Sequence, residues 1–235
     1  MNGKQSRYIN LDNAASTPSF KSVQKAVNNF LDFYSRIHRG SGFKSRLPTH
    51  FYEHSRSIGI EKIAEHESEL TPYPLRRLAE IPSIRIFGNP NPETINNCLG
   101  VIPFTMNEIS HFLVAAVLSC ESGIGVRSGC FCAHPYLLHL LEISPQKAQQ
   151  VHQNIMSGDR TDMPGIVRVS LGLYNTGEDI DALVESLQII DRRDFQGKYF
   201  QDNASGEVIP KDWHPDFNSF FFGLMTCLFE KLLFR

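Results

Sequence analysis

The sequence of 235 residues lacks a strong charge excess and a long apolar run. It has 23 Lys and Arg residues against 25 Asp and Glu residues, for a formal net charge of -2, so no basic surplus favours nucleic-acid binding. No uncharged apolar stretch approaches the ~20 residues that cross a bilayer as a helix. The first residues contain no apolar core of a secretory signal, so we expect a soluble, cytoplasmic protein.

Cysteines are also few, and their number is odd. The sequence contains 5, at positions 98, 120, 130, 132 and 227. An odd number in a chain without a secretory signal favours reduced thiols over a disulfide framework. Two of the cysteines, Cys130 and Cys132, lie close together in the stretch 125–135, which reads GVRSGCFCAHP.

Three chemical roles can be weighed for Cys130 and Cys132. A zinc site needs about four ligands, and His134 is a possible third donor with no second Cys or His pair behind it. A disulfide across one residue would be strained, and a reducing compartment disfavours it. A nucleophilic thiolate is better supported, because Arg127 lies nearby and a cationic neighbour lowers the pKa of a thiol. On the residues alone, two loop cysteines are more often structural than catalytic.

Two further groups of basic residues are candidates for anion binding. Arg168 lies within an apolar strand, IVRVSLGL, where a guanidinium needs a partner. That partner is either a substrate carboxylate, which Arg binds with two hydrogen bonds, or an Asp or Glu of the chain itself. His38 and Arg39 lie in the loop IHRGSGFKS, which would meet an anionic ligand or form an ordinary basic surface loop.

The apolar pattern predicts an α/β sandwich, with helices packed on a small sheet. We expect strands over 83–88, 97–106, 125–128 and 166–173, and helices over 20–34, 49–80 with interruptions, 107–122, 135–142 and 177–190. The polar segment 149–163 is expected to be a loop. These elements divide the chain into an N-terminal arm and helix (1–60), an α/β domain (61–190), and a linker with an apolar C-terminal helix (191–235).

Five segments, in order, resemble class V aminotransferase-fold enzymes, the pyridoxal-phosphate group that includes cysteine desulfurases. They are YINLDNAASTP, RIHRGSGFKSRLPTHFYEHSR, IEKIAEHESELTPYPLRRLAEIPSIRIFG, GVRSGCFCAHP and GIVRVSLGLYNTGEDIDAL. The resemblance covers most of residues 8–190. It implies that 61–190 is the small C-terminal α/β domain of a fold-type I pyridoxal-phosphate enzyme, preceded by a helical arm.

The resemblance assigns roles to the two cysteines and two of the arginines. Cys132, directly before Ala-His-Pro, matches the cysteine that accepts sulfur when a desulfurase converts L-cysteine to L-alanine. Cys130 stands two residues earlier and would be a second thiol of the catalytic loop. Arg168 matches the arginine that binds the substrate carboxylate, and Arg127 matches an arginine of the cysteine loop.

The resemblance also assigns roles near the start of the chain. His38 and Arg39 match residues that reach the active site, in this family often across a dimer interface. Asn13, Ala14 and Ala15 match the N-terminal turn beside the substrate. A homodimer, or pairing with a full-length relative, is therefore the expected assembly, and a small amino acid is the family's substrate.

One departure from the family's pattern is large. Only SIGI separates Arg56 from Glu61, where the family has its central domain with the Schiff-base lysine. No lysine of the sequence stands in a Ser-x-His-Lys context, so we assign no residue to cofactor binding and none to a metal. We expect the chain to be inactive alone. The alternative is a non-catalytic interaction or sulfur-carrier module, while membrane contact by the apolar helix 217–234 is not favoured.

Overall fold

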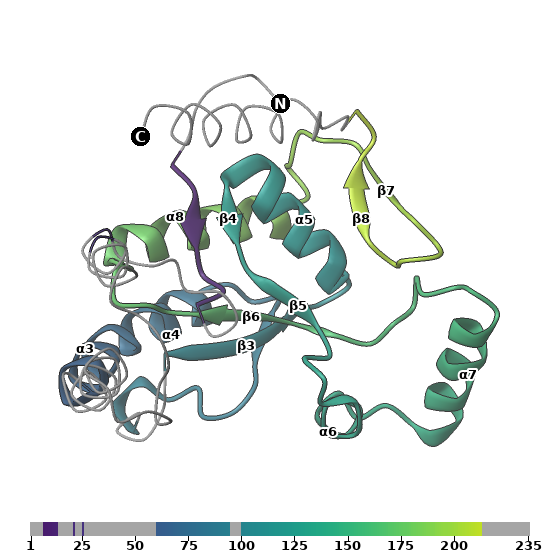
Figure 1. Cartoon of the computed structure of the whole chain (residues 1–235), viewed down its shortest axis with the longest axis horizontal. Coiled ribbons are helices and arrows are strands. Elements are labelled where there is room, and N and C mark those ends of the chain that lie inside the picture. The colour runs from purple at the N-terminus through teal and green to yellow at the C-terminus, as the bar shows by residue number, and fades with distance from the viewer. Residues whose placement is uncertain (1–6, 14–20, 22–24, 26–59, 95–99, 213–235) are drawn as a thin grey trace, which may run out of the picture.

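The computed structural model describes residues 7–13, 21, 25, 60–94 and 100–212 (Figure 1). The expectations for Ala14, Ala15, His38, Arg39 and the C-terminal segment 217–234 lie outside these residues.

The described chain alternates short strands with helices. The helices are α3 (Ile60–Leu70), α4 (Pro72–Ala79), the 3-10 turn η1 (Pro92–Thr94), α5 (His111–Ser122), α6 (His134–Leu140), α7 (Pro145–Met156) and α8 (Gly177–Asp191). The strands are β1 (Ile9–Asn10), β2 (Ile84–Ile86), β3 (Val101–Met106), β4 (Ile124–Gly125), β5 (Arg127–Gly129), β6 (Ile166–Ser170), β7 (Tyr199–Gln201) and β8 (Val208–Pro210). The predicted α/β class is confirmed.

A four-stranded antiparallel sheet in the order β2-β3-β6-β5 organises the domain. The alternating burial along β3 directs Ile102, Phe104 and Met106 to one face of this sheet, where they join the main core. Helices α4, α5 and α8 contribute their apolar stripes to the same core. The domain is therefore a two-layer sandwich, as Figure 1 shows for α5 and α8 beside the sheet.

The opposite face of the sheet has a smaller apolar cluster. Ile166 of β6 packs there with Phe87 and with Leu137 of α6, and Cys130 and Phe131 lie against them. Because side chains alternate along a strand, Arg168 belongs to the same face as Ile166. The arginine and cysteine candidates therefore lie on the face of the sheet that α4, α5 and α8 leave uncovered.

The first residues of the described chain complete this domain. Strand β1 runs parallel to β4, and Asp12 then forms a bridge with Ser170 at the end of β6. Leu11 donates its amide to Gly125 O over 2.7 Å and accepts from Ser170 N over 2.6 Å. The start of the chain thus lies between two segments that are more than a hundred residues away in the sequence.

The expectation of a loop over 149–163 is wrong for its first half, because α7 continues to Met156. Ser144 caps this helix by accepting from the Lys147 amide, and Pro145 occupies its first turn. Only Val151 of α7 is buried, so the sequence lacks the apolar stripe that would reveal the helix.

Residues 199–210, expected to be part of a linker, form the hairpin β7–β8. No helix among the described residues is long and apolar enough to cross a membrane.

Candidate functional site

Two arginines face each other across neighbouring strands. Arg127 of β5 and Arg168 of β6 are direct partners in the antiparallel register. Like charges in such positions repel each other. Asp12 offsets this repulsion: its Oδ1 accepts from Arg168 Nη2 over 3.3 Å, and its Oδ2 lies 3.8 Å from Arg127 Nη1. The three side chains retain one net positive charge, which suits a further carboxylate.

The two arginines differ in their access to solvent. The side chain of Arg168 is 19% exposed and that of Arg127 is 55% exposed, while Asp12 is 14% exposed. Arg168 Nε is buried and has no hydrogen-bond partner among the described residues. The carboxylate of the chain itself, one of the two partners considered for Arg168 from the sequence, is therefore present as Asp12. It leaves the Nε group of the guanidinium without a hydrogen-bond partner among the described residues.

Asn13, a predicted substrate-binding residue, is buried and holds chain segments together. Its Nδ2 donates to Ser170 O and to Asn175 Oδ1, both over 2.9 Å, and to Asn10 O over 3.0 Å. These bonds fix the end of β1 against β6 and against the loop before α8. The side chain therefore helps to position Asp12, and any direct contact with substrate remains a prediction.

Both cysteines belong to one tight turn, with Cys130 at its first position and Cys132 at its third. Ala133 N donates to Cys130 O over 2.9 Å, and the central residues Phe131 and Cys132 both have positive φ, of 52° and 60°. Turns of this kind favour Asn and Gly at their centre, because a side chain in the left-handed region is strained. Such strain concentrates at functional sites.

The turn gives its two thiols different environments. Cys130 is half-buried and its Sγ donates to Pro164 O over 2.9 Å, and burial raises the pKa of this thiol. Cys132 is exposed. The thiolate is the reactive form, so Cys130 is held as a protonated, partnered thiol and Cys132 is the accessible one.

Phe131 connects this turn to the arginines. The Arg168 guanidinium carbon lies 4.7 Å from the centre of the Phe131 ring, a cation–π contact. The structure thereby brings Arg127, Arg168 and the turn of Cys132 to one face of the sheet. The effect of Arg127 on the Cys132 thiol stays a prediction.

Sequence reasoning missed Asp12 and Phe131. The sequence did carry a signal for each, because Asp12 is an acid that directly follows an apolar strand and Phe131 separates the two cysteines.

Among the side chains that the structure describes, those in contact with Arg168, Arg127 and the cysteine turn supply carboxylate, thiol and aromatic groups, and none of them offers an amine for a Schiff base with pyridoxal phosphate. Lys147 lines a separate pocket, and Lys198 and Lys211 flank the hairpin β7–β8. Likewise, no group of three or more His, Cys, Asp or Glu side chains is placed to hold a metal within the described residues.

Comparison with known proteins gives one family. The family model for aminotransferase class V matches residues 49–183. A probable cysteine desulfurase of Streptomyces coelicolor is 36% identical over 145 residues, which are 62% of this chain and 28% of the relative. A cysteine desulfurase of Escherichia coli (strain K12 / DH10B) is 31% identical over 140 residues, covering 60% of this chain and 28% of the relative.

Two solved structures are also similar. The cysteine desulfurase CsdA of Escherichia coli, in its S-sulfonic acid form, matches 61% of this chain and 29% of its own, with a TM-score of 0.43 and 21% identity. The apo cysteine desulfurase of Thermococcus onnurineus NA1 matches 60% of this chain and 29% of its own, with a TM-score of 0.44 and 22% identity.

The matched segment covers only 28% of the length of the curated relatives. The family match covers more than half of the present chain and includes β2, β3, β5 and β6 with the cysteine turn. The chain belongs to the class V aminotransferase family, whose cysteine desulfurases depend on pyridoxal phosphate.

Proposed function

We propose that this chain is a sulfur-accepting module of the desulfurase type, which takes sulfur onto Cys132 from a full-length relative and does not desulfurate cysteine alone. The observation that carries the proposal is the difference between the environments of the two thiols. Cys132 is exposed on a strained turn, whereas Cys130 donates a hydrogen bond to Pro164 O. An accessible thiol is what a persulfide acceptor requires.

The transfer is a thiol exchange that needs no further oxidant. The Cys132 thiolate attacks the outer sulfur of a cysteine persulfide on the donor enzyme. The sulfur–sulfur bond of the donor breaks, a new one forms to Cys132, and the donor cysteine leaves as a thiolate. A proton then equilibrates with solvent on the new Cys132 persulfide.

Two features support the proposal that this chain does not desulfurate cysteine by itself. The segment between Arg56 and Glu61 is too short to contain a cofactor domain, and the contacts of Arg168, Arg127 and Cys130 with other described side chains include no lysine amine. The cofactor supplies the electron sink of this chemistry, and the protein must anchor and orient it. Arg168 is still suited to a carboxylate, either of a free amino acid or of the partner.

The test combines the purified chain with a full-length cysteine desulfurase, L-cysteine and pyridoxal phosphate. We expect intact-mass and peptide analysis to find one added sulfur atom on Cys132, absent in Cys132→Ser and retained in Cys130→Ser. Sulfur that remains bound in Cys132→Ser would overturn the assignment. The chain alone with cofactor and cysteine should release no sulfide, and sulfide release would refute the proposed inactivity.

We also infer that the chain pairs with itself or with the full-length relative. The support is an incompletely covered face of the sheet. This face carries Arg127, Arg168 and the half-exposed Val101, and within the described residues α6 covers only part of it. Light scattering behind size exclusion, with and without the relative, measures this. A monodisperse monomer in both cases contradicts the pairing.

A further inference from the structure

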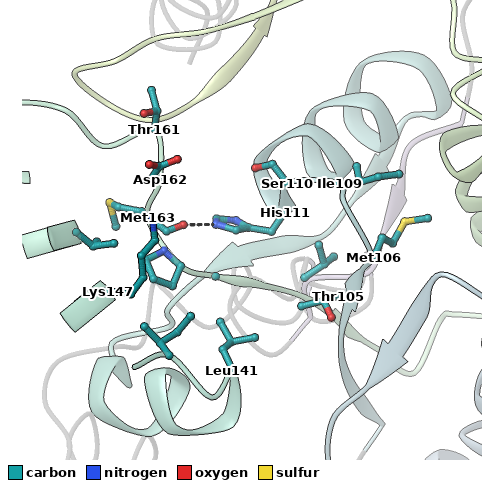
Figure 2. A pocket seen from close by; sticks show the side chains of 15 residues that line it. Thr105, Met106, Ile109, Ser110, His111, Leu141, Lys147, Thr161, Asp162 and Met163 are labelled. Atoms are coloured by element: carbon teal, nitrogen blue, oxygen red, sulfur yellow. Dashed lines mark hydrogen bonds between the residues drawn. The ribbon is translucent and has the colours of Figure 1, made fainter. Parts of the chain in front are cut away.

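A cavity lies between the start of α5, the end of β3, the segment from α6 into α7, and residues 161–165 (Figure 2). It borders the cysteine turn through Pro164, whose carbonyl accepts from Cys130. Its volume is about 370 Å³, within the range of about 300–1,000 Å³ typical of small-molecule sites. The proposed sulfur transfer to Cys132 does not involve this cavity. The chemistry of its lining therefore points to a different ligand.

Most of the wall is apolar. The side chains come from four separate parts of the chain: Met106, Ile109, Leu141, Ile143, Val151 and Met163. Burying an apolar group of a ligand against such a surface is favourable, because it removes apolar area from water. It selects an aliphatic or aromatic body rather than a fully polar molecule.

His111 lies in the wall, where a hydrogen bond to Met163 O holds its ring. Its Nε2 lies 3.0 Å from Met163 O, so Nε2 carries the proton and Nδ1 the lone pair (Figure 2). The residue is 8% exposed, and Nδ1 is buried without a partner among the described residues. Burial lowers the pKa of His111, which keeps the ring neutral. Gly165 leaves room for the ring, since a Cβ there would lie 2.3 Å from Nε2.

Opposite charges complete the lining. Lys147, in the first turn of the 12-residue helix α7, and Asp162 both line the cavity, and neither has an ion pair within the described residues. Figure 2 shows Lys147, Asp162 and Met163 on one side and His111 on the other. The N-terminus of α7 adds partial positive charge beside Lys147. The cavity therefore offers a cation and an anion beside an apolar wall.

We propose that this cavity binds a free apolar amino acid as its zwitterion. The carboxylate pairs with the Lys147 ammonium group at the start of α7. The ammonium group pairs with the Asp162 carboxylate, and the side chain packs on the apolar wall. This site is separate from Arg168, so it does not depend on the proposed sulfur transfer.

Methionine methyl groups give a local readout, because two of the 5 methionines of the chain line the cavity. We expect titration with L-phenylalanine to shift the ¹³C-methyl signals of Met106 and Met163 saturably, with a Kd on the order of 1 mM for a ligand of this size. The exposed Met156, outside the cavity lining, should not move. Glycine, without an apolar body, should produce no saturable shift.

Matched ligands and variants identify each charge. We expect 3-phenylpropionate, which lacks the ammonium group, and phenethylamine, which lacks the carboxylate, to bind at least about tenfold more weakly than phenylalanine. Asp162→Asn should weaken the binding of phenylalanine but not the binding of 3-phenylpropionate. Lys147→Gln should weaken the binding of phenylalanine but not the binding of phenethylamine. Lys198→Gln, next to the β7–β8 hairpin, is the control and should leave both affinities unchanged.

Lys147 and Asp162 are both exposed, so these variants retain the fold. Absence of saturable shifts at Met106 and Met163 overturns the proposal. Equal binding of phenylalanine and both analogues, or no loss of affinity in the two charge variants, overturns it as well.

Discussion

Removing the charge of Asp12 tests the central arrangement of the site. Asp12→Asn keeps the size of the side chain and its place after β1, but it removes the carboxylate that lies between Arg168 and Arg127. The two guanidiniums would then face each other across β5 and β6 without a counter-charge. We expect the variant to fold with a lower free energy of unfolding.

The magnitude follows from burial and distance. Breaking a fully buried ion pair costs about 3–5 kcal/mol, whereas exposed pairs contribute about 0–1 kcal/mol. Arg168 and Asp12 are mostly buried, but their atoms are 3.3 Å apart, which is long for a charge-assisted hydrogen bond. We therefore expect a loss of about 1.5 kcal/mol, which lowers the Tm by about 3–6 °C for a chain of this length.

Urea unfolding followed by circular dichroism measures this loss. The matched control is Glu93→Gln, which breaks the exposed pair of Arg76 and Glu93, whose atoms are 3.0 Å apart. We expect that control to cost less than about 0.5 kcal/mol. Arg127→Gln added to Asp12→Asn should restore part of the stability, because it removes the repulsion. The reasoning is refuted if Asp12→Asn costs no more than the control, or if the second change restores nothing.

Three further perturbations have defined outcomes. Gly165→Ala should destabilise the chain by about 1–3 kcal/mol in urea unfolding, because the added Cβ meets the His111 ring; an unchanged midpoint would contradict this contact. Cys132→Gly should be more stable than Cys132→Ala by about 1 kcal/mol in thermal unfolding, because φ is 60° at this position, and equal stabilities would show an unstrained turn. Burial lowers the pKa of His111, so the unfolded chain binds more protons below about pH 6.5, and stability present above that pH is lost as the pH falls. Between pH 7 and pH 5, the free energy of unfolding of His111→Gln should depend less on pH than that of the unchanged chain. An identical slope for the two proteins would exclude His111 as the cause.

Sequence patterns predicted the strands of the sheet and the helices packed on its main core well. The alternating and apolar residues of 83–88 and 166–173 indicated β2 and β6, because burial on the sheet requires such residues. Helix α7 was missed because its cap and first proline lie before the polar residues that looked like a loop. The hairpin β7–β8 was missed because each of its strands has only three residues.

At the site, residue types in sequence order indicated Cys132, Cys130, Arg127 and Arg168. Sequence order could not show that the carboxylate next to the arginines comes from Asp12, because the pairing joins residues 156 positions apart. Nor could it distinguish the two thiols, since the partner of Cys130 is a backbone carbonyl 34 positions away. Long-range pairings of this kind depend on the completed sheet.

The position of β1 also sets an order for folding during synthesis. Its sheet partner β4 leaves the ribosome long after it, and the end of β6 follows later still, so the pairing of β1 and Asp12 is complete only after residue 170 has been made. Leu11, which is completely buried in the finished domain, can meet Gly125 earlier but lacks its second backbone partner, Ser170, until then. Closing so long a loop is slow, because contacts distant in sequence cost more chain entropy before they form. Expression of the region from residue 60 onward alone would leave a gap beside β4, so the first strand must be supplied with the domain or added back as a peptide.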